Sequence, residues 1–121
     1  MNKKRRREIM GTINMAEKIQ KEFEDVQEPV NKEQVDQLMS KLNKLLKIVG
    51  NILSDEEYSF YNMPDGLQES DNGVVSQEAQ ENLGEAVNSL YEAITLLNDG
   101  IINDDTIDAI IDAIIYMEDS V

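Results

Sequence analysis

Hydrophobic residues recur at helical spacing along most of the chain. In residues 3–26 the apolar positions step by three or four, which places them on one face of a helix. These positions are Ile9, Ile13, Ala16, Ile19, Phe23 and Val26. Pro29 follows, and the residue before a proline leaves the helical region of backbone space. We therefore expect a first helix that ends near residue 26.

The second periodic stretch is the most regular. Its apolar residues follow the a and d positions of a heptad repeat: Val35, Leu38, Leu42, Leu45, Val49 and Ile52. Asn31 and Gln34 have the spacing of a capping box, which predicts that the helix begins just after Asn31. The pattern stops at residues 59–75, where Pro64-Asp65-Gly66 and Asp71-Asn72-Gly73 are typical of turns. The sequence thus predicts a long connecting loop there.

Two more helices are predicted in the second half. One begins at Ser76 as N-cap and ends at Asn98, before Gly100, with an apolar stripe. The stripe consists of Ala79, Leu83, Ala86, Leu90, Ala93 and Leu97. The other runs from Asp104 or Asp105 to about Glu118 and is almost entirely apolar, so it needs burial on most of its surface. Two arrangements would supply that burial: packing against the rest of the bundle, or a dimer contact through Ile111 and Ile115. The sequence leaves both alternatives open.

Together these patterns predict an all-α fold in one domain, residues 1–121. We expect a small bundle of three to four helices, with a long heptad-like second helix and a basic N-terminal arm at residues 1–7. Composition narrows the chemistry, because the chain contains no Cys and no His. It therefore lacks thiol chemistry, the commonest general base and the commonest transition-metal ligand. We predict a non-enzymatic protein without cofactor or metal. No apolar run is long enough to span a membrane, so we expect a cytoplasmic protein with no membrane partner.

Charge is distributed very unevenly. All eleven Lys and Arg residues lie in the first 47 positions, residues 51–121 contain 17 Asp and Glu, and the net charge is −14. Such a surface repels nucleic acid and attracts basic grooves. A helical row of carboxylates also resembles a row of phosphates in spacing. The predicted partner-binding acidic face consists of Glu78, Glu81, Glu85, Glu92, Asp104, Asp105, Asp108 and Asp112.

Two shorter segments are further candidates. The basic arm contains Lys3, Lys4, Arg5, Arg6 and Arg7, which either contact phosphates, fold back on the acidic half or remain solvated. An aromatic and acidic segment contains Asp55, Glu56, Glu57, Tyr58, Phe60 and Tyr61. Its aromatic side chains either dock onto a basic protein surface or plug the end of the bundle.

Three blocks of residues resemble a group of small acidic proteins from phages and mobile elements of Firmicutes and other gut bacteria. The first block is Asn2, Lys3, Arg5 and Arg6. The second is Glu56, Glu57, Asn62, Met63, Pro64, Leu67, Gln68 and Ser70. The third is Glu78, Ala79, Leu83, Ala86, Leu90, Ala93 and Ile94. The resemblance covers about half of the chain. It implies a helical protein in a bacterial host cell and implies no reaction.

The sequence therefore predicts a binding protein. The leading hypothesis is an acidic phage or mobile-element protein that occupies the nucleic-acid-binding surface of a protein partner, as an inhibitor of host defence would. One alternative is a structural adaptor that acts by helix–helix pairing or homodimerisation. A second alternative is a nucleic-acid accessory factor that uses the basic arm, although the acidic body makes direct nucleic-acid binding unfavourable.

Overall fold

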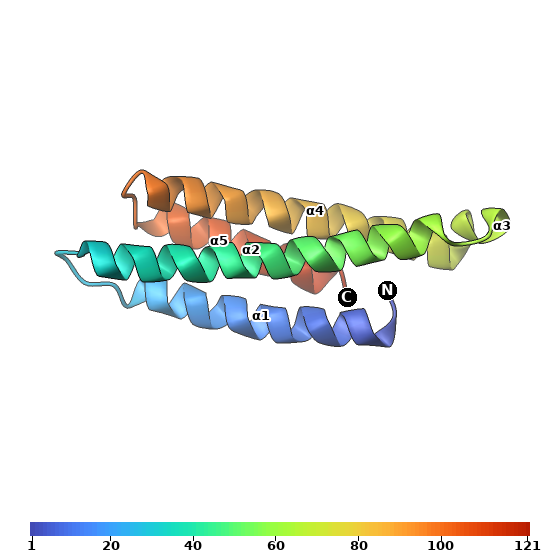
Figure 1. Ribbon diagram of the computed structural model, residues 1–121, viewed down its shortest axis with the longest axis horizontal. Helices are drawn as coiled ribbons and strands as arrows, with labels where there is room; N and C mark the ends of the chain where they lie inside the picture. The colour runs from blue at the N-terminus through green and yellow to red at the C-terminus, as the bar shows by residue number, and fades with distance from the viewer.

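Five helices and no strands make up the structure, a computed structural model that covers residues 1–121 (Figure 1). Four of the helices are long: α1 (Lys3–Glu24), α2 (Lys32–Tyr61), α4 (Asp71–Asn98) and α5 (Asp104–Asp119). The fifth, α3 (Asp65–Gln68), is a single turn between α2 and α4. The predicted all-α bundle is confirmed.

The long helices run alternately up and down and close into a ring. In this ring α1 packs on α2, α2 on α4, α4 on α5, and α5 returns to α1 (Figure 1). Short connections favour this antiparallel order of neighbours. As a result, α1 and α2 form one side of the bundle, and α4 and α5 form the opposite side.

The helix ends follow the capping signals in the sequence. Asn31 and Gln34 form the predicted capping box at the start of α2. Gly100 follows α4 with φ 77°, and the amides of Gly100 and Ile101 donate to the carbonyls of Leu97 and Leu96, both over 2.9 Å. This is a Schellman motif, which glycine adopts without steric penalty.

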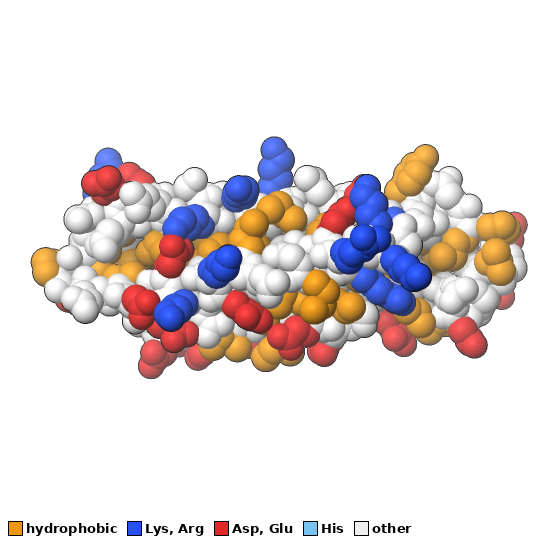
Figure 2. Space-filling view, turned by 90° about the horizontal axis from the view of Figure 1, so that it is seen from below, with side chains coloured by type: hydrophobic (Ala, Val, Ile, Leu, Met, Phe, Trp, Pro, Cys, Tyr) orange, Lys and Arg blue, Asp and Glu red, His pale blue; other side chains and the backbone are white.

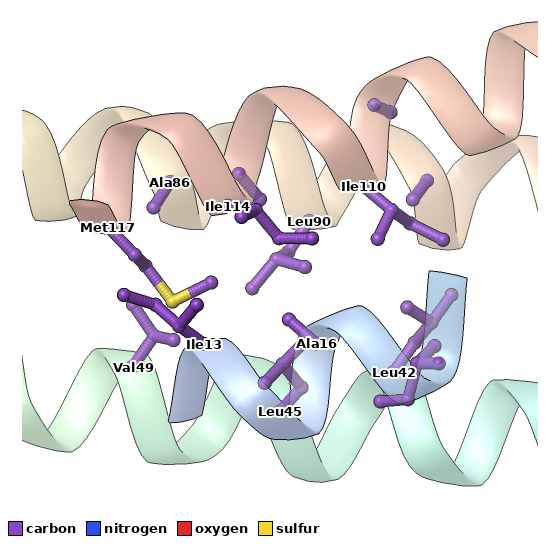
Figure 3. Close-up of a cluster of buried hydrophobic side chains, with 14 of the residues drawn as sticks. Ile13, Ala16, Leu42, Leu45, Val49, Ala86, Leu90, Ile110, Ile114 and Met117 are labelled. Atoms are coloured by element: carbon purple, nitrogen blue, oxygen red, sulfur yellow. The ribbon is translucent and has the colours of Figure 1, made fainter. Parts of the chain in front are cut away.

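The core is one hydrophobic cluster built from all four long helices. It contains most residues of the predicted stripes, including Ile13 and Ala16 of α1, Leu45 of α2 and Leu90 of α4 (Figure 3). From α5, Ile114 joins them (Figure 3). The regular heptad spacing of α2 therefore serves packing inside the monomer.

Residues 59–75 are not the long loop that the sequence predicted. Helix α2 continues to Tyr61, and α4 begins at Asp71 rather than at Ser76, with Ser70 as its N-cap. The prediction failed because its turn-forming residues are used in the short α3 turn and in the first turn of α4. The loop is thereby reduced to the few residues around α3.

Helices α2 and α4 extend beyond their neighbours at the α3 end, where both chain termini stop short (Figure 1). Asn82 of α4 donates from Nδ2 to the carbonyl of Asp119 over 3.3 Å, so the end of α5 lies beside Asn82. Eleven residues of α4 precede that point, which is about 16 Å of helix. We call residues 57–75, at the end of this projection, the tip.

Candidate functional site

All eight residues of the predicted acidic face are exposed. Four of them lie on α4 at relative positions 0, 3, 7 and 14, which is one stripe of a helix. The other four lie on α5, the neighbour of α4 in the ring. The two helices therefore present their carboxylates on the same side of the bundle, and the acidic face is a continuous structural unit of two helices.

No carboxylate on this side takes part in an ion pair. Helix α4 carries five Asp and Glu and α5 carries six, with no Lys, Arg or His on either helix. The ion pairs of the protein all involve α1, α2 or the amino terminus. The acidic side is thus free to meet charges from outside the molecule.

The opposite side of the bundle carries all of the basic residues. Figure 2 shows this contrast: Lys and Arg spread over the face viewed from the α1 side, and Asp and Glu gather along its lower edge. Because of the order of helices in the ring, the uneven distribution of charge along the sequence becomes a difference in charge between the α1–α2 side and the α4–α5 side.

The basic run is helical. Lys3 to Arg7 form the first turns of α1, and Asn2 caps them by accepting a hydrogen bond from the amide of Arg5 over 2.8 Å. Lys4 pairs with Glu8 at 3.8 Å. The run is therefore no free arm, and its four outer residues are solvated on a fixed helix. These are Lys3, Lys4, Arg6 and Arg7.

Arg5 has a different role, because it points into the bundle and meets Glu56. Its Nε donates to Oε2 of Glu56 over 2.7 Å. Ser76 donates to Oε1 of the same carboxylate over 2.8 Å, and the amine of Met1 lies 3.4 Å from it. We call these four groups the polar layer. They join α1, α2 and α4 at the level where the hydrophobic core ends.

The Glu56 carboxylate is buried, with only 2% of its side chain exposed. Burial alone would raise the pKa of Glu56, but its hydrogen bonds from Ser76 and Arg5 and the nearby positive charges outweigh burial and lower that pKa. The group is therefore a charged structural element. The prediction of Glu56 as a partner-binding residue is wrong, because no partner reaches a side chain so enclosed.

The other residues of the aromatic and acidic segment lie on the last turns of α2. Tyr58 and Tyr61 are 73% and 75% exposed, so they do not plug the end of the bundle. Phe60 is half-buried and meets Tyr61 edge to face, with ring centroids 6.1 Å apart. Asp55 is exposed and Glu57 half-exposed beside them. Tyr58 and Tyr61 are therefore accessible to a partner, as docking onto a protein surface requires.

Three exposed hydrophobic residues of the tip escaped the sequence reasoning. Leu67 lies on α3, and Val74 and Val75 lie in the first two turns of α4. Their exposure depends on the projection of α2 and α4 beyond α1 and α5, which no local pattern encodes. The sequence gives one indication of this exposure: after residue 61 the apolar residues are isolated and no longer follow a regular helical spacing.

The tip is held by a dense set of local contacts. The Gln68 side chain donates to the carbonyls of Phe60 and Met63 at 3.2 and 3.5 Å. Gly73 lets α3 approach α4 closely, because a Cβ there would lie 2.0 Å from the carbonyl oxygen of Gln68. The exposed side chains are thus presented by a fixed backbone.

The two residues predicted as a dimer face differ in their exposure on α5. Ile111 is half-buried and Ile115 is 48% exposed, whereas Ile110, Ile114 and Met117 are buried in the monomer core. The bundle therefore covers most of the apolar surface of α5. Only a narrow strip of apolar surface on α5 remains exposed for contact with a second copy of the chain.

No three Asp or Glu side chains lie close enough together to hold a metal ion. None of the helices combines the length and apolar composition that a membrane crossing requires. In the comparisons with known proteins, no family model, no curated protein and no solved structure matches the chain.

Proposed function

We propose that the protein acts without catalysis, by binding a basic surface of a protein partner through the acidic face of α4 and α5. One observation carries the proposal: eleven exposed carboxylates lie on two adjacent helices that contain no basic residue and form no ion pair. Ordered arrays of like charge steer association and set specificity, although each exposed contact is individually weak.

The preferred partner surface is one that normally holds nucleic acid. Carboxylates at helical spacing present negative charge at intervals similar to those of backbone phosphates. A rigid α4–α5 pair would then compete with nucleic acid for a basic groove. The resemblance to phage and mobile-element proteins adds a setting in which the partner is a host defence nuclease and the protein its inhibitor.

The test is an affinity capture from bacterial lysate with three versions of the protein. The wild type should retain proteins at about 50 mM NaCl and release them by about 500 mM, and added DNA should compete with it. The triple variant Glu81→Lys, Glu85→Lys and Glu92→Lys should retain none of them. The matched control reverses Glu17, Glu33 and Asp36, which are exposed on α1 and α2.

The two triple variants have the same net charge, so only the position of the charges differs between them. Loss of binding in the α4 variant alone supports the proposal. Equal loss in both variants would mean that general electrostatic attraction, and not the acidic face, determines binding.

A structural adaptor is the second candidate, and the exposure of Ile115 on α5 favours it. Helix pairing through Ile111 and Ile115 would then form a homodimer. Sedimentation of the wild type and of Ile115→Asp separates the candidates, because a dimer should become monomeric while its helicity stays. A nucleic-acid accessory role through Lys3, Lys4, Arg6 and Arg7 would instead show as direct DNA or RNA binding at low salt.

A further inference from the structure

The exposed hydrophobic residues of the protein are concentrated at the tip. Nine large hydrophobic side chains are exposed in the whole chain, and five of them lie between residues 58 and 75. They are Tyr58, Tyr61, Leu67, Val74 and Val75. The hydrophobic side chains at the right-hand end of Figure 2 lie in this part of the molecule. Concentrated exposed apolar groups are typical of protein interaction sites, and tyrosine is enriched at their centres.

This exposure is fixed by the structure. Gln68 and Gly73 hold α3 against the ends of α2 and α4, and Glu56 ties the base of the tip to Arg5 and Ser76. No buried polar side-chain atom lacks a hydrogen-bond partner, so no unsatisfied polar group strains the tip. A surface that is already ordered loses little conformational entropy on binding.

The charges within the tip are all negative. Asp65, Glu69 and Asp71 are exposed and Glu57 is half-exposed, and residues 57–75 contain no Lys, Arg or His. On the α1 side the tip adjoins one exposed cation, Arg6, which lines the same pocket as Met63 and Val75. Arg5 lines that pocket too but is already paired with Glu56. A docked partner therefore meets apolar groups interspersed with carboxylates.

We propose that the tip is a second binding surface, which takes a cationic amphipathic segment of a protein partner. The apolar face of such a segment would cover the exposed tyrosine, leucine and valine side chains, and its Lys and Arg would face the carboxylates between them. The inference rests on the proposed function in one respect, the positive charge of the partner. It adds an apolar contact that charge alone does not provide.

A titration of the isotope-labelled full chain, followed by NMR amide shifts, tests this surface directly. The probe is a helical peptide of leucine and lysine, compared with oligolysine and with the matching peptide of leucine and glutamate. We expect the leucine–lysine peptide to shift amides of residues 57–75 and to bind about tenfold more tightly than oligolysine. Oligolysine should shift only α5 and the part of α4 that follows the tip, residues 76–98.

Two variants sharpen the comparison. Tyr58→Ala with Leu67→Ala should reduce the affinity for the leucine–lysine peptide to that for oligolysine. Tyr91→Ala, a tyrosine exposed on α4 outside the tip, should leave it unchanged. Both variants alter exposed side chains, and their unchanged helicity would be checked by circular dichroism.

The inference is overturned if the leucine–lysine peptide leaves the tip unshifted, or if the leucine–glutamate peptide shifts it equally. Failure of oligolysine to bind α4 and α5, with the tip still shifted by the leucine–lysine peptide, would contradict the proposed function and leave the tip surface standing. The two failures are therefore distinguishable.

Discussion

Arg5 and Glu56 are 51 residues apart in the sequence and share a 2.7 Å hydrogen bond between Nε and Oε2. This contact fixes the first turn of α1 against the last third of α2. Because Ser76 of α4 also donates to Glu56, the contact serves the architecture of this end of the bundle.

Removal of Arg5 should destabilise the protein strongly. Arg5→Ala leaves the buried carboxylate of Glu56 with only the Met1 amine as counter-charge. Breaking a buried pair typically costs about 3–5 kcal/mol, and we expect the lower end of that range because the amine remains. The free energy of unfolding in urea measures the effect. Lys4→Ala is the control, because its 3.8 Å contact with Glu8 is exposed and should contribute less than about 0.5 kcal/mol. Equal effects of the two substitutions would contradict the structural role of Arg5.

The contribution of Glu56 should depend on pH in the acid range. The pKa of Glu56 is lowered in the folded protein, so the unfolded chain takes up its proton first as the pH falls. The stabilisation by Glu56 is thus complete above the ordinary glutamate pKa of about 4.3 and is lost as the pH falls through the lower folded-state pKa.

Urea unfolding of the wild type and of Glu56→Gln at a series of pH values tests this dependence. The difference between the two proteins should be constant near neutral pH and should shrink in acid. A difference that grows as the pH falls would mean that the folded protein favours the protonated form of Glu56.

Periodicity predicted the helices well, because the side chains that pack the core recur every three or four residues. It failed where polar residues occupy core positions. Glu56 continues the heptad spacing four residues after Ile52, and Arg5 precedes Ile9 by four. Both positions continue the line of core residues on their helices. Because charged residues are usually exposed, the sequence predicted both on the surface. Only the spatial meeting of three helices shows that these charges compensate one another.

The acidic face was predictable for a different reason. Helix-forming spacing and the absence of basic residues after position 47 are both visible in the sequence. What the sequence lacked was the relative length of the helices. The tip exists because α5 ends beside Asn82 while α4 continues, and a length difference between elements distant in sequence leaves no local pattern.

Gly73 and Gly84 lie on the same helix and should respond oppositely to a methyl group. Gly73→Ala would place its Cβ against the carbonyl of Gln68, and the backbone of α3 would have to move, at about 1–3 kcal/mol. Gly84→Ala meets nothing within 4 Å and should stabilise the helix by about 0.5–1 kcal/mol. Thermal midpoints of both variants test the close approach of α3 to α4. A stabilised Gly73→Ala would show that α3 does not lie there.

The stability of the whole bundle should increase with added salt. The carboxylates of α4 and α5 repel one another without any compensating ion pair, and ionic strength screens repulsion between exposed charges. The thermal midpoint should therefore rise between about 20 mM and about 500 mM NaCl, where the Debye length falls from about 20 Å to about 4 Å. The triple variant of Glu81, Glu85 and Glu92 to Lys should show a smaller rise, because part of the repulsion is already removed. A midpoint that falls with salt would instead mean that the ion pairs of α1 and α2 dominate the electrostatic contribution to stability.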